Sequence, residues 1–411
     1  MLARDLWRDF AAVTASVAVL GIGVGSTLPL TALVLTSRGY GPEVVGWMVA
    51  VLAAGGVAGT LAAPSAALRY GRRPVMQGCV AAAALSVILL QYVGSLWAWA
   101  LLRALFGAAM APLFVLGEAW ISTLPADAVR GRVVALYTTS FTLCQVVGPV
   151  LTDALANRPA DAFLICGAVF LLGMPGIALA RDAPPGTAGS RAGNGHVTGG
   201  DGSIAAGSIA AKDAAASWLT ILRTAPAIVA GAGLFAAFDN IMLSFLPLFA
   251  LDRGLSRGRA LAAVVIVFLG DATLQFAAGS LADRFGRARV HRLAGLYLVL
   301  LLPFLPVLVR IPGAWEAYLY LLGGVAGSVY TLSMVSSGER FSGAALLRAS
   351  GLIALTWNLA SSIGPAATGV VMEYWGPAAM TAVLWLMAVG FVAATRVERS
   401  AAMIPLRSDV L

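Results

Sequence analysis

The sequence has 411 residues, of which 60% are apolar and only 11% are charged. Soluble globular domains carry about 25% charged residues. That contrast and the mean hydropathy of +0.88 exclude a soluble enzyme, a disordered chain and a secreted disulfide scaffold. The net charge of +8 is almost all arginine. Because these arginines lie in short clusters between apolar runs, they indicate topology in a lipid bilayer and no nucleic-acid partner.

Apolar runs of about 20 residues recur along the whole chain, which is the pattern of membrane-spanning helices. The first follows a charged start but is too long for the apolar part of a signal peptide, so we interpret it as a span. The sequence predicts an all-α membrane protein with twelve transmembrane helices, at about 10–35, 43–67, 75–94, 97–122, 132–156, 161–180, 220–250, 259–282, 290–309, 314–336, 348–372 and 377–396.

The distribution of arginine and lysine predicts that both termini are cytoplasmic. With that orientation, cytoplasmic segments hold 20 of these residues and outer loops hold 6, and Arg103 inside a span completes the total of 27. Positive residues concentrate in cytoplasmic loops of membrane proteins. We therefore expect a multi-pass protein of the cell inner membrane.

The chain divides into two similar halves. Residues 181–217 are rich in Gly, Ala, Ser and Pro, which predicts a flexible cytoplasmic linker between a six-helix bundle at 1–180 and another at 218–396, with a tail at 397–411. Parallel six-helix repeats around a central site are transporter architecture. Motifs recur at an offset near 216: Gly148-Pro149 with Gly364-Pro365, Gly107 with Gly323, Arg132 with Arg348, and Arg69–Arg72 with Arg284–Arg287.

The run GSLADRFGR at residues 279–287 resembles the GxxxDRxGR signature of the major facilitator superfamily, and RALFG at 103–107 resembles its RxxxG motif. Within the superfamily, GEAW at 117–120 and RGRVVALY at 130–137 are similar to the YcaD-like group. The resemblance covers all twelve spans. It implies secondary transport of a small solute by alternating access, with no enzymatic activity and no cofactor.

Two departures from the family pattern limit what the resemblance implies. The first-half copy of the signature has Pro64 and Leu68 where the motif has glycine and aspartate, so its acidic residue is missing. The Gly148-Pro149 pair also lacks the surrounding glycines of the drug–proton antiporter motif. The positions in question hold Ala135, Cys144, Thr152 and Asp153.

Three ionisable residues lie at membrane depth, where insertion costs about 2.5–3.5 kcal/mol and function is the default interpretation. Asp239, near the middle of the seventh span, is the first candidate for a proton carrier, because a desolvated carboxylate takes up a proton more readily. Asp271 of the eighth span is the second, or it supports the Asp283 loop instead. Arg103 binds an anionic substrate group or influences a nearby acid, unless it forms a structural ion pair.

Several polar and aromatic residues at membrane depth are candidates for substrate binding. For the polar ones the alternative is an interhelical hydrogen bond, which is worth about 0.6 kcal/mol on average. An aromatic ring at such a position stacks on a planar substrate or packs against its neighbours. Together with Arg103, the candidates are Asn240, Gln145, Tyr330, Trp357 and Asn358.

The signature loop predicts a conformational gate on the cytoplasmic side. We expect Asp283 to meet the start of the fifth span at Arg132 when that side closes, because helix N-termini and arginine both favour an anion. Glu118 is expected to pair with Arg130 or Arg132. The remaining gate residues are Gly279, Arg284, Gly286 and Arg287.

The sequence thus predicts a monomeric, proton-coupled secondary transporter for a small organic solute, with export favoured because the family holds many exporters. Uptake of a planar or vitamin-like nutrient is the first alternative. The second is a membrane sensor or partner subunit that no longer transports. No metal site is expected, since His196 and His291 are isolated in the sequence.

Overall fold

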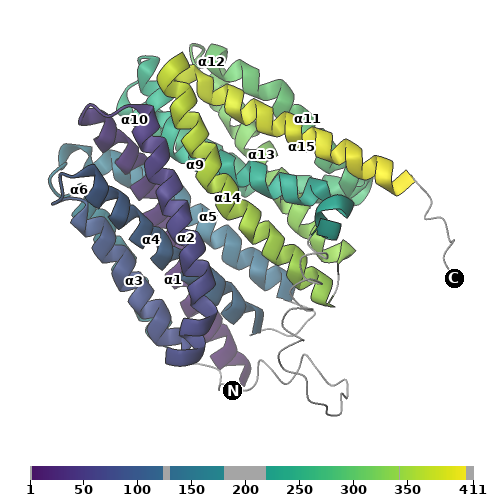
Figure 1. Ribbon diagram of the computed structural model, residues 1–411, viewed down its shortest axis with the longest axis horizontal. Coiled ribbons are helices and arrows are strands. Elements are labelled where there is room, and N and C mark those ends of the chain that lie inside the picture. Colours follow the sequence, from purple (N-terminus) through teal and green to yellow (C-terminus); the bar gives the residue numbers. More distant parts are fainter. Residues whose placement is uncertain (1, 124–129, 180–218, 342, 404–411) are drawn as a thin grey trace.

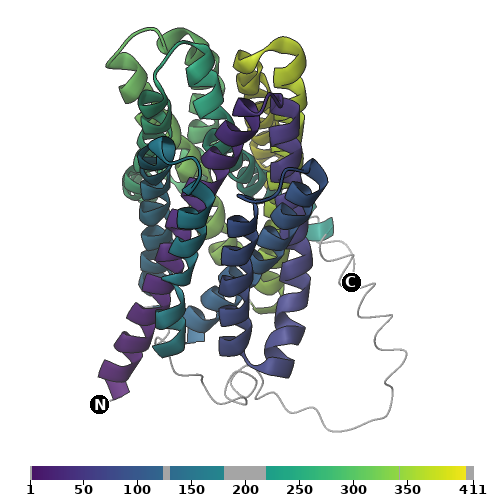
Figure 2. The ribbon, with the colours of Figure 1, turned by 90° about the vertical axis from the view of Figure 1, so that its left-hand side faces the viewer.

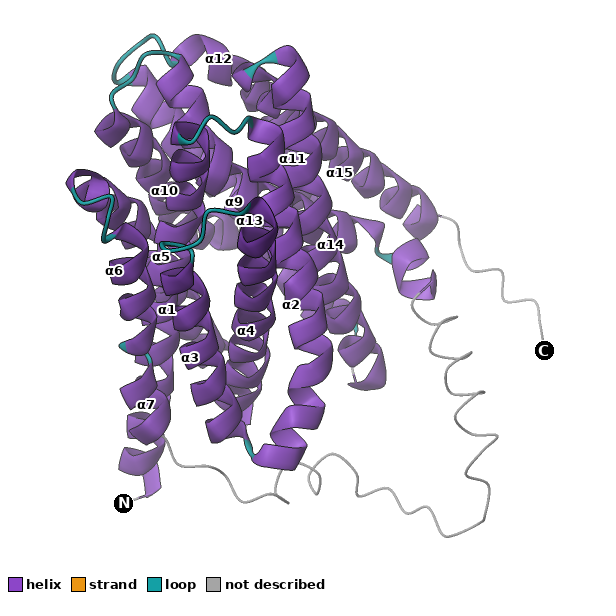
Figure 3. Cartoon of the chain, turned by 60° about the vertical axis from the view of Figure 1, so that its left-hand side comes forward, coloured by secondary structure: helices purple, strands orange, loops and turns teal. Residues whose placement is uncertain are grey.

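The computed structural model describes residues 2–123, 130–179, 219–341 and 343–403 (Figure 1). The helices run roughly along one direction, with the N-terminus at one end of the bundle (Figure 2). The described residues contain helices, turns and loops and no strand (Figure 3). The α-helices are α1 (Leu2–Ser37), α2 (Pro42–Tyr70), α3 (Arg72–Leu89), α4 (Leu96–Thr123), α5 (Arg130–Ala154), α6 (Ala162–Leu171), α7 (Met174–Leu179), α9 (Pro226–Asp252), α10 (Arg257–Phe285), α11 (Arg287–Leu301), α12 (Leu305–Leu308), α13 (Ala314–Arg340), α14 (Gly343–Trp375) and α15 (Met380–Met403).

The helices have the length and surface of membrane spans. Within the described part of the chain, nine stretches are long and apolar enough to cross a bilayer, and α3, α5 and α14 cover the other three predicted segments. Large apolar side chains such as Leu61, Trp97 and Leu386 are exposed. Exposed apolar surface on this scale suits lipid and not water. The prediction of an all-α membrane protein is confirmed.

Prolines break two of the predicted segments. The seventh span was expected to begin near residue 220, but α9 begins at Pro226, because proline suits the first turn of a helix, where its missing N–H is not needed. The ninth span ends as an α-helix at Leu301 and continues as a short 3₁₀ turn and α12, with Pro303 and Pro306 at the break. Proline inside a helix removes a backbone hydrogen bond.

Glycines bring helices together in the same way in both halves. A Cβ at Gly107 would collide with the carbonyl oxygen of Leu52, and a Cβ at Gly323 with that of Val267. The α2–α4 packing of the first half therefore recurs as the α10–α13 packing of the second. In a membrane, where apolar burial from water does not drive association, such close backbone approach supplies much of the packing energy.

The first and second halves meet along α2–α14, α1–α9 and α5–α10. Along α2 and α14 the contacts run from Gly41 beside Glu373, through Gly46 beside Pro365, to Gly56 beside Asn358. The two helices lie together at one end of the bundle and diverge towards the other (Figures 1 and 3). We call the end that holds the first turns of α2 and the last turns of α14 the closed end.

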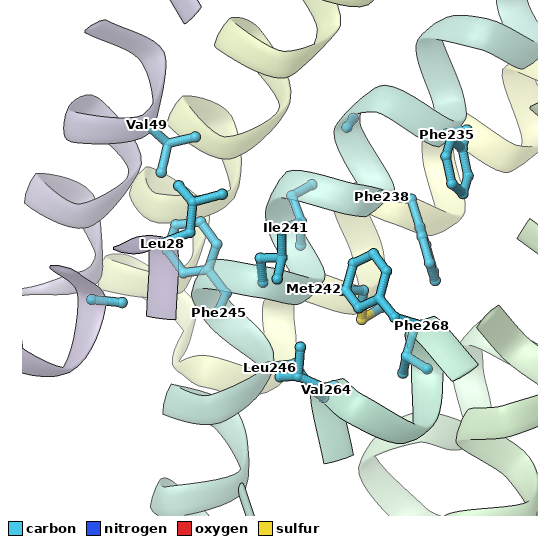
Figure 4. Close-up of a cluster of buried hydrophobic side chains, with 14 of the residues drawn as sticks. Leu28, Val49, Phe235, Phe238, Ile241, Met242, Phe245, Leu246, Val264 and Phe268 are labelled. Atoms are coloured by element: carbon cyan, nitrogen blue, oxygen red, sulfur yellow. The ribbon is translucent and has the colours of Figure 1, made fainter. Parts of the chain in front are cut away.

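Apolar side chains fill the junction of the halves towards the closed end. Figure 4 shows Leu28 of α1 and Val49 of α2 next to Phe245 of α9, and all three are buried in one continuous core. The helix α9 is the innermost of the candidate spans, with 89% of its most apolar stretch buried. Residues on α9 are therefore placed to contact both halves.

Candidate functional site

Asp239 links the two halves at mid-span. It lies 13 positions into α9 and is partly exposed, and its Oδ1 accepts a hydrogen bond of 3.5 Å from Nε2 of Gln145 on α5. The two residues are 94 positions apart and belong to different halves. A carboxylate hydrogen-bonded across this junction is a group whose charge can influence how the halves pack.

Asp271 lies deeper, inside the second half. Its side chain is 3% exposed, and its Oδ1 accepts a hydrogen bond of 2.7 Å from Gln275, whose own carbonyl oxygen accepts one from Thr331 of α13. Gly327 of α13 leaves room for the carboxylate. Asp271 therefore holds α10 against α13 through Gln275.

Three aromatic rings from three helices meet at Phe235, which lies one helical turn before Asp239 on α9. The centroid of Phe235 on α9 lies 5.3 Å from that of Tyr330 on α13 and 6.0 Å from that of Trp357 on α14, and the last two are 5.1 Å apart. We call these rings the aromatic cluster. Tyr330 and Trp357 were predicted from the sequence, whereas Phe235 was not. Phe235 is four residues before Asp239, so both lie on one face of the helix. This spacing was the signal in the sequence that could have identified Phe235 as a candidate.

The two predicted asparagines have different surroundings. Asn240 is buried, and its Nδ2 donates to the carbonyl of Ala236 and, at 3.2 Å, to Oγ of Ser361 on α14. This is the interhelical type of hydrogen bond, and it fixes α9 against α14. Asn358 is partly exposed and donates to its own helix at Ala354, with its Oδ1 directed towards Gly56.

Arg103 is fully buried in the first half. Its guanidinium carbon lies 5.7 Å from the centroid of the Phe106 ring, and none of its three side-chain nitrogens has a hydrogen-bond partner among the described residues. A buried cation without hydrogen bonds is costly. The structural ion pair that was the alternative for Arg103 is not seen among the described residues in this conformation.

The signature loop forms a tight turn, which the first half reproduces without the acid. Gly286 and Gly71 have φ of +89° and +86°, a conformation that only glycine adopts easily. Asp283 is exposed and accepts a hydrogen bond of 3.1 Å from Arg287, which also pairs with Glu339 of α13.

The other predicted gate residues make no described contact with this turn or lie outside the described residues. Arg284 is exposed, and no atom lies within 4 Å of a Cβ built at Gly279. The side chains of Glu118, Arg130 and Arg132 lie outside the described residues. The expected contact between Asp283 and Arg132 therefore stays a prediction.

An ion pair at the closed end was not predicted. Asp153 at the end of α5 lies 4.0 Å from Arg257 at the start of α10, and Gly258 leaves space beside the carboxylate. Both side chains are about half exposed. The sequence offered only a weak signal, because Asp153 occupies a position where the antiporter motif has glycine.

These observations describe a two-part helical membrane protein with a hydrogen bond between carboxylate and amide across its junction and an aromatic cluster in its second half. The family model of the major facilitator superfamily matches residues 13–270. The chain belongs to the major facilitator superfamily.

Its relatives include YfkF of Bacillus subtilis, described as an uncharacterized MFS-type transporter, which is 24% identical over 368 residues and 87% of each chain. YcaD of Escherichia fergusonii, described in the same words, is 22% identical over 68% of this chain and 66% of its own. YcaD is thus a distant relative of this chain, in agreement with the resemblance to the YcaD-like group.

Solved structures show the same fold. A D-xylose-proton symporter aligns with a TM-score of 0.71 and 16% identity over 95% of this chain and 99% of its own. The nucleoside transporter NupG gives 0.71 at 14% identity over 96% and 99%. A partially occluded inward-open form of the xylose transporter XylE from E. coli gives 0.67 at 16% identity over 97% and 99%. The protein is a multi-pass secondary transporter and not an enzyme.

Proposed function

We propose that this transporter exports a small organic solute from the cytoplasm in exchange for protons, with Asp239 as the proton carrier and Asp271 as a second acidic group. The observation that carries the proposal is the hydrogen bond from Gln145 to Asp239 across the junction of the halves. It ties the protonation state of one carboxylate to the contact between the moving parts.

Protonation changes this contact in a defined direction. Hydrogen bonds to an ionised acceptor are roughly twice as strong as those between neutral groups. An ionised Asp239 therefore holds α9 and α5 together more firmly than a protonated one. A proton arriving at Asp239 weakens the junction and makes it easier for the halves to rock, which is how a proton gradient drives alternating access.

The predicted topology assigns the direction of opening. If both termini are cytoplasmic, the closed end faces outward, and the end at which α2 and α14 diverge faces the cytoplasm (Figure 1). A membrane potential contributes about 2.3 kcal/mol per charge per 100 mV, which is adequate to drive solute exchange by protons. Arg103 is placed to acquire a charged partner in another conformation of the cycle, because it has no described hydrogen-bond partner in this one.

The test is transport in proteoliposomes with an imposed pH gradient and a library of metabolites and drugs. The wild type should concentrate at least one solute against its gradient. Asp239→Asn should abolish gradient-driven accumulation and leave solute exchange between equal concentrations intact. Asp252→Asn is a matched control, because Asp252 lies on the same helix at its exposed end beside Arg253. Accumulation by Asp239→Asn at the wild-type level would contradict the assignment, and solute entry together with protons would indicate uptake.

A further inference from the structure

We infer that Glu398 of α15 is a positioning residue that holds the first turns of α9 against α13 and α15. These three helices then move as one body when the end opposite the closed end closes. This applies whether or not protons drive transport, because it concerns which helices move together. The supporting observations are the contacts of one carboxylate, the packing around the start of α9 and the place where α9 meets the first half.

The start of α9 has no cap from its own sequence. Ala225 occupies the N-cap position without a side-chain hydrogen bond, and Pro226 in the first turn has no N–H. Ala227 therefore carries the first backbone N–H of the helix that needs a partner. Oε2 of Glu398 accepts this hydrogen bond at 3.2 Å, from a position 171 residues further along the chain. The cap of α9 is thus supplied by α15.

The same carboxylate binds a third helix. Oε1 of Glu398 pairs with Nη1 of Arg340 at the end of α13, and the side chain of Glu398 is only 12% exposed. A carboxylate at a helix N-terminus is stabilised by the free N–H groups and the helix dipole, most strongly where it is partly buried. A hydrogen bond to an ionised acceptor is also stronger than one between neutral groups. Glu398 therefore joins α9, α13 and α15 at a point that is largely shielded from water.

One turn further along α9, a second contact holds it against α13. A Cβ at Gly231 would collide with Oγ of Ser333, so the two helices lie directly against each other here. Oγ of Ser333 donates to the carbonyl of Val329 at 2.8 Å and lies 3.1 Å from Nε2 of His291 on α11. The buried His291 ring packs in turn on Phe391 of α15. Helices α11, α13 and α15 thus meet beside the second turn of α9.

The apolar neighbours of the start of α9 also belong to the second half. Buried side chains there form two small clusters with apolar residues of α13, α14 and the short segment between them. Further along, α9 meets the first half at Asp239, which accepts the hydrogen bond from Gln145, and at Phe245, which Figure 4 shows next to Leu28 of α1. The described contacts of its first turns therefore bind α9 to its own half, whereas its later turns lie at the junction.

The alternative is that α9 bends by itself. Gly231 and Gly233 lie in its second turn, and glycine is a common place for a helix to kink. Bending there would move the first turns towards the first half while α13 and α15 stay in place. The two possibilities differ in the distance between the start of α9 and α15. This distance is constant if Glu398 holds the helices together, and it varies if α9 bends alone.

Spin labels measure this distance in the purified full-length protein, which samples its conformations when no gradient is present. Thr224, just before α9, and Ala393 of α15 are exposed and are replaced by labelled cysteines after the three native cysteines are changed to serine. The protein with Glu398 should give one narrow distance, and Glu398→Ala should give a broad distribution. Glu398→Gln keeps an acceptor for the N–H of Ala227 but loses the charge, so it should lie between them. Two distances with Glu398 present, or no change in Glu398→Ala, would overturn the inference.

Hydrogen exchange gives a second measurement on the same proteins. The first amides of α9 should exchange about 2- to 30-fold faster in Glu398→Ala, which is the range for loss of a helix cap. Glu339→Ala is the matched control, because Glu339 precedes Arg340 at the end of α13 and pairs with Arg287 of α11. It should leave the distance and the exchange at the start of α9 unchanged. Equal effects of the two variants, or faster exchange spread evenly over the bundle, would indicate a general loss of stability and contradict the role of Glu398.

Discussion

Replacing Arg103 with methionine should stabilise the folded protein and abolish transport. Arg103 is fully buried, its nitrogens have no described hydrogen-bond partner, and its nearest described compensation is the Phe106 ring. Methionine has a similar length and adapts to irregular packing. The substitution therefore removes an uncompensated charge with little loss of contact area.

The magnitude follows from two opposing contributions. An arginine at the middle of a span costs about 2.5–3.5 kcal/mol. A desolvated cation–π contact such as that with Phe106 returns about 1–2 kcal/mol. The difference is about 0.5–2.5 kcal/mol in favour of Arg103→Met. Arg103→Lys keeps the charge but loses the planar stack on the ring, so it should be no more stable than the wild type.

Thermal unfolding of detergent-solubilised protein at a fixed scan rate measures the effect, together with transport activity. Leu113→Met is the matched control, because Leu113 is also fully buried on α4 and the exchange conserves volume. A stabilised but inactive Arg103→Met would show that the arginine is retained for function at the expense of stability. A clear loss of stability in Arg103→Met, with Leu113→Met unchanged, would refute the reasoning and indicate a stabilising ion pair.

Three further variants test the two ends of the bundle. In Gly46→Leu the new Cβ would lie 2.5 Å from the Pro365 carbonyl oxygen, and overpacking of this kind costs about 1–3 kcal/mol. The population of molecules in which the closed end is open should therefore rise by about 5- to 150-fold. Spin-label distances between the halves measure this change, and unchanged distances would contradict it. Asp153→Asn should change the same distances only slightly, because a half-exposed ion pair is worth less than about 1 kcal/mol; a large change would make this pair the main latch. Asp283→Asn should make introduced cysteines at the site more reactive to cytoplasmic thiol reagents, and Leu68→Asp should partly reverse this; identical labelling with intact transport would exclude the gate.

The sequence by itself determined the class of fold and the family. Apolar runs long enough to span a bilayer are a one-dimensional signal, because each span satisfies its backbone hydrogen bonds internally and needs no partner to be recognised. The GSLADRFGR run at 279–287 and the repeat near 216 residues are equally local. The intramembrane charges Asp239, Asp271 and Arg103 were visible for the same reason, since any ionisable group in a span is conspicuous.

What the intramembrane residues contact was decided only by the tertiary structure. Gln145 and Asp239 are 94 residues apart, and nothing in either local sequence indicates that α5 meets α9 at that depth. Phe235 looks like an ordinary packing residue until Tyr330 and Trp357 approach it from two other helices. Arg103 was compatible with an ion pair or with substrate binding, and only the tertiary structure shows that its side chain is fully buried with no hydrogen-bond partner among the described residues. The physical reason is that helix packing in a bilayer depends on small residues and rare polar contacts summed over whole faces, which no single segment of sequence encodes.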